Sequence, residues 1–301
     1  MTGFVQLNNG NAVELPAALA WEIERSDGEE QESFLYRFPF RSGWRETLAN
    51  ALRFYAKEDG ATVFCGTVDH FSLLLDGSGT VCELRGRGMA GILADNEQPS
   101  RAAASITGAQ LIASYLTPYG ISASYSSLTT LSSFSVAMGT SAWQVVRDYC
   151  DFAGFLRPRF QANGALLLTA AREVSGKRFT EAQAVKLSIR DCREGIVSKL
   201  CRVGKNGTQT FLNERYISDG GMCTQYESAA GKVPAARVIA RAMEKRRRVE
   251  LTLTGSFLAE PSQSVTLELT PFSLSGTFYV AKCRSVLDGG GRLCTLTLYQ
   301  S

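Results

Sequence analysis

The predicted fold depends on one ten-residue pattern that occurs twice, as Leu75-Asp76-Gly77-Ser78-Gly79-Thr80-Val81-Cys82-Glu83-Leu84 and as Leu287-Asp288-Gly289-Gly290-Gly291-Arg292-Leu293-Cys294-Thr295-Leu296. A single offset of 212 residues aligns the two copies and makes six of the ten positions identical. These positions are Leu75, Asp76, Gly77, Gly79, Cys82 and Leu84 in the first copy, and Leu287, Asp288, Gly289, Gly291, Cys294 and Leu296 in the second. Asp and Gly are the residues that tight turns between antiparallel strands require, so each copy predicts a β-hairpin.

The Cys and the Leu that the two return strands share are not explained by turn chemistry, which accounts only for the Asp and the glycines. Each copy also follows a strand that contains aromatic residues, Val63 to Val68 in the first case and Phe278 to Lys282 in the second. We interpret the pattern as a domain duplication, with chance convergence of two hairpins as the alternative. Short antiparallel strands with polar turns favour closed barrels, because closure removes exposed strand edges. The two copies therefore predict two small β-barrel domains.

The region between the two copies changes to an α+β pattern. Apolar residues from Ile106 to Leu116 recur at helical spacing, with Thr107 as the expected N-cap. A second helix is expected after Ser141, and the dipeptide Asn163-Gly164 predicts a hairpin turn. We therefore expect a mainly β protein with an α+β insertion, in which two small duplicated β-barrel domains flank a helix-helix-hairpin domain. The expected boundaries are 1–98 for the first β-barrel domain, 99–184 for the insertion, and 185–301 for the second β-barrel domain.

In the β-rich parts, one helix is an open alternative and another is expected. The segment Trp44 to Tyr55 could begin as a helix instead of a strand, because Leu48, Leu52 and Tyr55 share one helical face. In the second β-rich part, Ala235 to Arg247 is the expected helix. The basic residues at its end, from Arg241 to Arg248, are attributed to the negative carboxyl end of that helix.

Composition is that of a soluble globular protein. The chain has 301 residues, of which 45% are hydrophobic and 20% are charged, and its net charge is +3. This charge is too small to imply a polyanionic partner. An acidic segment 1–60 and a basic segment 181–260 could favour docking between copies, or could both be solvated surface. The first residues lack the pattern of a secretory signal, and no apolar run has the length of a membrane span, so we expect a protein made in the cytoplasm without membrane insertion.

No pattern of a catalytic or metal site is present. The single histidine, His70, lies in a strand-like run and is interpreted as a structural residue. The run from Gly86 to Gly91 spells G-x-G-x-x-G but does not open a nucleotide-binding βαβ unit. Nothing singles out a catalytic pair among the many carboxylates. We therefore expect no enzymatic activity, no cofactor, no metal and no sequence-specific contact with nucleic acid.

The eight cysteines form no CxxC pair, and most are expected to be buried free thiols. A turn centred between Gly289 and Gly290 places Cys294 opposite Ser285 and not opposite Cys283. In the same way, a turn centred on Gly77-Ser78 places Cys82 opposite Leu73 and not opposite Cys65. Disulfides across the two hairpins are therefore not expected.

The order of these features resembles a family, the baseplate hub proteins of contractile phage tails and related injection systems, which includes the late-control-protein-D and Mu-type hubs. The matching stretches are Val63 to Asp69, similar to the family's F-x-G-x-V strand; Val81 to Leu93, with its Gly-Arg pair; Ser141 to Val145, followed by Gly154-Phe155; and Thr277 to Val280 with Leu287-Asp288-Gly289. The family often has an Asp after its Gly-Arg pair, whereas this chain has Gly88 there and Asp95 later, so no role is transferred to an acid at that place.

The resemblance implies two tube-like barrels per subunit in a homotrimer, which would form a pseudo-six-fold ring that joins a six-fold tail tube to a three-fold spike. It implies a virion or phage-like particle, assembled in the bacterial cytoplasm, as the location, and the tail tube protein, the spike protein and other baseplate proteins as partners. The alternative is a tail-associated cell-wall-degrading enzyme, for which the chain shows no compact catalytic constellation. A secreted carbohydrate-binding β protein is disfavoured by the missing signal and by only three tryptophans.

Overall fold

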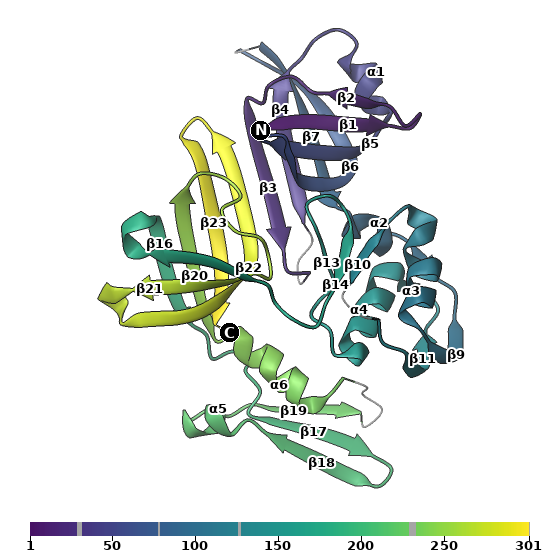
Figure 1. Cartoon of the computed structure of the whole chain (residues 1–301), viewed down its shortest axis with the longest axis vertical. Coiled ribbons are helices and arrows are strands. Elements are labelled where there is room, and N and C mark those ends of the chain that lie inside the picture. Colours follow the sequence, from purple (N-terminus) through teal and green to yellow (C-terminus); the bar gives the residue numbers. More distant parts are fainter. Residues whose placement is uncertain (29–31, 78, 126–127, 229–232, 301) are drawn as a thin grey trace.

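The computed structural model describes residues 1–28, 32–77, 79–125, 128–228 and 233–300, and it is mainly β, as the sequence predicts (Figure 1). The first part of the chain contains β1 (Thr2–Leu7), β2 (Ala12–Glu14), β3 (Ala20–Ser26), β4 (Ser33–Pro39), α1 (Trp44–Ala49), β5 (Ala51–Glu58), β6 (Ala61–Asp76) and β7 (Gly79–Gly88). The middle part contains α2 (Ala90–Ala94), β8 (Glu97–Gln98), β9 (Arg101–Ile106), α3 (Gly108–Tyr115), β10 (Ala123–Tyr125), β11 (Leu131–Val136), β12 (Thr140–Ser141), α4 (Ala142–Ala153), β13 (Arg159–Phe160) and β14 (Leu166–Leu168).

The last part of the chain adds strands on both sides of a small lobe. It contains β15 (Val174–Thr180), β16 (Ala184–Asp191), β17 (Lys199–Gly204), β18 (Gly207–Leu212), α5 (Glu214–Ser218), β19 (Thr224–Ser228), α6 (Ala235–Glu244), β20 (Arg247–Thr254), β21 (Ser264–Leu269), β22 (Leu274–Asp288) and β23 (Gly291–Gln300). Short 3-10 turns lie at Thr117–Tyr119, Glu181–Gln183 and Thr270–Phe272.

One large sheet runs through both β-rich parts. Its strand order is β16-β20-β23-β22-β3-β4-β7-β6-β5-β1-β2, and β21 pairs with β22 and with β15. The link is the antiparallel pairing of β3 with β22, from Trp21 opposite Leu287 to Ser26 opposite Lys282. Among the described residues no pairing closes this path into a ring, so barrel closure stays a prediction.

The two halves of this sheet have the same strand order. In the first half it is β3-β4-β7-β6-β5 and in the second β16-β20-β23-β22-β21, with the strands in the same chain order and every neighbouring pair antiparallel. Each long strand also shifts register against its own return strand at the same place, between Val68 and His70 in β6 and between Val280 and Lys282 in β22. The differences 280 − 68 and 282 − 70 both equal 212, which is the offset that aligns the two sequence patterns.

Turn chemistry predicts the register of both hairpins correctly. Cys82 lies opposite Leu73, and Cys294 lies opposite Ser285. Ser78, in the first turn, lies outside the described residues. Although Cys283 and Cys294 are not direct neighbours across the hairpin, their sulfurs are 3.6 Å apart, and both are free thiols in the core of the second half.

The predicted helices of the middle part are present with their predicted caps. The Thr107 side chain accepts a hydrogen bond from the Gln110 backbone N–H, and Gln110 completes a capping box at the start of α3. The Ser141 hydroxyl caps α4, which ends at Gly154 with a left-handed φ of 79°.

The local structure outside the middle part agrees with the sequence only in part. The segment from Trp44 begins as a helix, α1, which was one of the two alternatives, and continues as a strand, β5. The helix predicted to reach Arg247 ends at Glu244, because Val249, Leu251 and Leu253 alternate with less buried residues and form a strand that begins at Arg247. The three-stranded sheet β18-β17-β19 and the helix α5 were not predicted. Together with α6 they form what we call the α6 lobe, with a small core of its own around Leu200.

Separate apolar cores lie under the two halves of the sheet and in the middle part. The middle core includes Cys65 from β6 and Met89, which directly precedes α2. Loop residue Phe257 also packs against the first core, where its ring stacks on Trp21 at a centroid distance of 5.7 Å. No helix in the described parts of the chain is long and apolar enough to cross a membrane.

Substitution of Trp21 tests how far the pairing of the two half-sheets depends on core packing, because Trp21 lies on β3 and its side chain is only 1% exposed. We expect Trp21→Ala to lower the free energy of unfolding by about 3–5 kcal/mol, since it removes a large buried side chain. The measurement is urea denaturation followed by circular dichroism. The control is Leu52→Ala on β5, a side chain that is 56% exposed, which is expected to change stability by at most about 0.5 kcal/mol. Equal losses in the two variants would contradict this view of the core.

Candidate functional site

The two sequence-predicted hairpins lie in the same sheet and point the same way. The strands β22, β3, β4, β7 and β6 follow one another with antiparallel pairing at each step, so β6 and β22 run in the same direction. Both turns therefore lie at the same end of the sheet, as Figure 1 shows. Only β3 and β4 separate the two hairpins.

The repeated residues divide into core positions and exposed positions. Cys82 and Leu84 are fully buried in the core of the first half, and Cys294 and Leu296 are fully buried in the core of the second. The remaining positions lie at the turns, where Gly77, Gly79, Asp288, Gly289 and Gly291 are exposed and Leu287 is half-buried. Leu75 is 80% exposed, and its neighbours Leu73 and Leu74 are 39% and 40% exposed, so the first hairpin has an apolar tip.

His70 is exposed on β6. Within the described residues, no group of three or more His, Cys, Asp or Glu side chains is arranged to hold a metal ion. The notable charged groups of the structure lie instead where the parts of the chain meet.

Arg87 joins the first hairpin to the segment after α2. Its guanidinium donates hydrogen bonds to both oxygens of Asp69, at 2.8 and 2.9 Å, and to both oxygens of Asp95, at 2.9 and 2.7 Å. These hydrogen bonds raise the pKa of Arg87 and lower the pKa of Asp95. Asp95 therefore has a structural contact that its position in the sequence did not reveal.

A buried charge cluster joins β3 to β13 and to the loop before β21. Arg25, which is 2% exposed, forms an ion pair with Glu260 and lies 3.9 Å from Glu32 (Arg25 Nε to Glu32 Oε1). Arg25 also donates to the backbone carbonyl of Phe160 at 3.5 Å. Because Glu32 is buried, its pKa rises to about 7 even though Arg25 acts in the opposite direction.

Gly88 makes room for Glu32 in this cluster. A Cβ atom at Gly88 would lie 2.5 Å from a carboxylate oxygen of Glu32 and 2.6 Å from its Cβ, so a larger residue does not fit without movement. Gly88 thus leaves the space that the Glu32 side chain, which comes from another segment, occupies.

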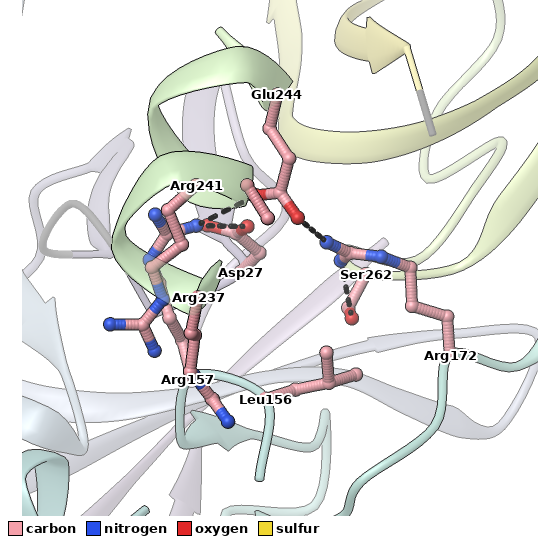
Figure 2. A pocket seen from close by; sticks show the side chains of 9 residues that line it. Asp27, Leu156, Arg157, Arg172, Arg237, Arg241, Glu244 and Ser262 are labelled. Carbon is pink, nitrogen blue, oxygen red and sulfur yellow. Dashed lines mark hydrogen bonds and ion pairs between the residues drawn. The ribbon is translucent and has the colours of Figure 1, made fainter. Parts of the chain in front are cut away.

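A second charge network surrounds the pocket in Figure 2, which lies between the end of β3, two loops of the middle part, and α6. Glu244, the last residue of α6, lies 2.9 Å from Arg172 (Oε1 to Nη2) and 3.8 Å from Arg157 (Oε2 to Nη1). Arg157 also lies 3.4 Å from the Asp27 carboxylate, directly after β3. The Tyr279 hydroxyl donates to Glu244 at 3.0 Å, and because burial raises the pKa of Tyr279 it remains a protonated donor.

Two further contacts complete this junction. The Arg172 guanidinium lies 3.5 Å from the centroid of the Tyr279 ring, within the range of a cation–π interaction. Arg241 of α6 forms an ion pair with Asp151 of α4. The α6 lobe is therefore tied by charged side chains to α4, to the loops around β13 and β14, and to the sheet.

Sequence reasoning did not identify the residues of these two networks. Arg157 lies in a segment read only as part of a hairpin, and Glu244 was read only as part of a helix. The sequence shows only that each of them is a charged residue within or beside an apolar run. This does not identify the residue with which it pairs.

The raised pKa of Glu32 leads us to expect that the stability of the protein depends on pH. Its pKa is about 7 in the folded protein and about 4.5 ordinarily, so the folded state binds the proton more tightly. Its contribution to stability is therefore fully present below about pH 4.5 and is lost as the pH rises through about 7, a change on the order of 3 kcal/mol. We expect Glu32→Gln to remove this part of the dependence in urea titrations at pH 5 and pH 8. The exposed Glu46→Gln is the control, and an unchanged profile in Glu32→Gln would refute the assignment.

The contacts of Glu244 lead us to expect that this residue holds the α6 lobe against the rest of the chain. Glu244→Gln removes the carboxylate that Arg157, Arg172 and Tyr279 share, and we expect a loss of about 1–3 kcal/mol in the free energy of local opening. Amide hydrogen exchange in residues 235–244 should accelerate accordingly, as read by mass spectrometry. Glu194→Gln, an exposed position, should leave that exchange unchanged. Equal exchange in the two variants would show that Glu244 does not hold the lobe.

Comparison with solved structures identifies proteins of similar fold. No protein-family model matches the sequence, and no curated protein matches it. The tail protein from Neisseria meningitidis MC58 has a TM-score of 0.81 at 14% identity, covering 99% of this chain and 96% of that one. The 43 kDa tail protein of prophage MuSo2 from Shewanella oneidensis has a TM-score of 0.76 at 15% identity, covering 99% and 97%.

A third similar structure comes from a secretion machine. It is a component of the type VI secretion system of E. coli, described as similar to the T4 bacteriophage tail proteins gp27 and gp5. Its TM-score is 0.61 at 10% identity, and the match covers 94% of this chain and 73% of that one. The resemblance to baseplate hub-like proteins that the sequence suggested is therefore confirmed at the level of the fold, which is that of phage tail proteins.

Proposed function

We propose that this chain is a structural baseplate hub of a contractile phage tail or phage-like injection particle, acting as a homotrimer that joins a six-fold tail tube to a three-fold spike. The observation that carries the proposal is the repeated strand order of the two half-sheets, with register shifts 212 residues apart. An internal repeat lets a three-fold assembly present six similar units. Such an assembly can match a six-fold partner at one end while it keeps three-fold symmetry at the other.

The direction of the two hairpins supports this role. Because both turns lie at one end of the sheet, three subunits arranged around an axis would place six hairpins at one end of a ring. We assign that end to the tail tube protein and the opposite end to the spike protein. Closure of each half into a barrel on assembly is part of the proposal, since it would cover strand edges that are open in the single chain.

The division of the chain also belongs to the proposal. We keep 1–98 and 185–301 as the two tube-forming parts and 99–184 as the insertion between them. The pairing of β15 with β21 draws residues 174–180 toward the second part. The particle itself, assembled in the bacterial cytoplasm, is the proposed location, with the other baseplate proteins as further neighbours.

The fold comparisons support a tail role without fixing it. The similar proteins from Neisseria meningitidis and Shewanella oneidensis are described as tail proteins, and the E. coli protein as a component of a secretion system. At these low identities the likeness concerns the fold, so the role of this chain is tested directly.

Mass photometry and negative-stain imaging of the purified chain, alone and with its tube and spike proteins, test the proposal. We expect particles of three-fold mass that appear as rings with the partners present. A chain that stays monomeric and forms no rings even with its partners would refute the hub role. Release of peptidoglycan fragments by the purified chain would instead favour the cell-wall-degrading alternative.

A substitution at the exposed tip of the first hairpin tests whether this tip contacts the tube protein. We expect Leu75→Asp to weaken binding to the tube protein by about tenfold or more, because it places a charge in an apolar contact. Since Leu75 is 80% exposed, the unfolding midpoint should not change. The matched control is Phe272→Asp, at a side chain that is 57% exposed and lies just before the start of β22, at the opposite end of that strand from the hairpin turn. Surface plasmon resonance gives both affinities, and equal values would exclude the first hairpin tip as the tube contact.

A further inference from the structure

The pocket beside α6 holds more positive than negative charge. Four arginines line it, Arg157, Arg172, Arg237 and Arg241, against two carboxylates, Asp27 and Glu244. About 140 Å³ of it is open to water-sized molecules. A water molecule occupies about 30 Å³, so the space accommodates a group several times larger.

Three of the four arginines already have carboxylate partners. Arg157 lies near Asp27 and Glu244, Arg172 pairs with Glu244, and Arg241 pairs with Asp151. For Arg237, no carboxylate of the described residues lies within ion-pair distance. Arg237 is half-buried, and burial together with the neighbouring charges of Arg241 and Arg157 lowers its pKa.

Neither the spacing of the arginines on α6 nor the nearby end of α4 compensates the excess positive charge of the pocket. Arg237 and Arg241 are four residues apart on α6 and so share one face, an arrangement in which like charges repel (Figure 2). A Cβ atom at Gly154 would lie 3.9 Å from Arg237 Nη1, which places this guanidinium near the carboxyl end of α4. A helix end supplies only about half an elementary charge, and Arg241 and Asp151 lie there too.

We propose that this pocket binds a phosphate-class oxyanion, with Arg237 as its principal ligand. A tetrahedral oxyanion accepts hydrogen bonds from several directions, and guanidinium groups reach the pocket both from α6 and from the loops that carry Arg157 and Arg172. The bound anion would balance the unpaired guanidinium and would connect α6 to the middle part of the chain. This inference does not depend on the proposed role in a tail, because it rests on the pocket of a single chain.

The test compares inorganic phosphate with sodium chloride at equal ionic strength. For the unmodified full chain we expect phosphate to raise the thermal unfolding midpoint more than chloride does, and isothermal titration calorimetry to show saturable binding. In Arg237→Gln the phosphate affinity should fall by about tenfold to a hundredfold, which corresponds to the loss of one charged hydrogen-bonding group. The control is Arg101→Gln, an exposed position on β9 outside the pocket, where phosphate binding should be unchanged.

Two results would overturn the proposal. One is a midpoint of the unmodified chain that phosphate raises no more than chloride does. The other is an equal phosphate effect in the unmodified chain and in Arg237→Gln, as expected if Arg237 only caps α4. If Arg237→Gln does not fold, Arg237→Met replaces it, since it keeps part of the aliphatic side chain and removes the charge. Phosphate affinity in that variant equal to that of the unmodified chain would likewise exclude Arg237 as the principal ligand.

Discussion

The pairing of β3 with β22 is the contact on which the rest of the structure depends. It joins the two β-rich parts of the chain, which are separated by more than two hundred residues, into one sheet. It also sets the direction of the two hairpins, because β6 and β22 are related through β3, β4 and β7. Arg25 lies on β3, and Asp27 follows directly after it, so the end of this strand is also where both charge networks begin. A strand in this position links the arrangement of the halves to the attachment of the middle part.

The two charge networks act on geometry more than on stability. Desolvation of buried charges offsets much of their mutual attraction, whereas removing one partner leaves the other charge without compensation. Arg25 and Asp27 are almost fully buried, so each must meet its partners in one arrangement of the surrounding segments. Such contacts specify how β13, α6 and the sheet meet. This is the property that a protein needs if its outer surfaces must fit several neighbours in an assembly.

The local parts of the fold were predictable because each depends on a few neighbouring residues. Asp and Gly in the turns determined the hairpin registers, and Thr107 and Ser141 marked the starts of α3 and α4. The end of α6 was not predicted, since the basic residues after Glu244 suit both the end of a helix and the first residues of a strand. The α6 lobe was missed because its short strands bury one face only against α6, which gives a weak period in the sequence. Of the candidate site, the repeated Cys and Leu positions were recognised, but Arg157, Glu244 and Arg87 were not.

By itself the sequence determined each hairpin, its register and the helices of the middle part, since each of these follows from residues close together in the chain. The order of these features along the chain was the basis of the resemblance to baseplate hubs. Only the tertiary structure decided that β3 pairs with β22, that the register shifts of β6 and β22 coincide, and that Glu32 fills the space beside Gly88. The physical reason is that these contacts join residues far apart in the chain. Strand pairing can be formed by any strand with a compatible face, and a charge can pair with any opposite charge, so folding of the whole chain selects the partner.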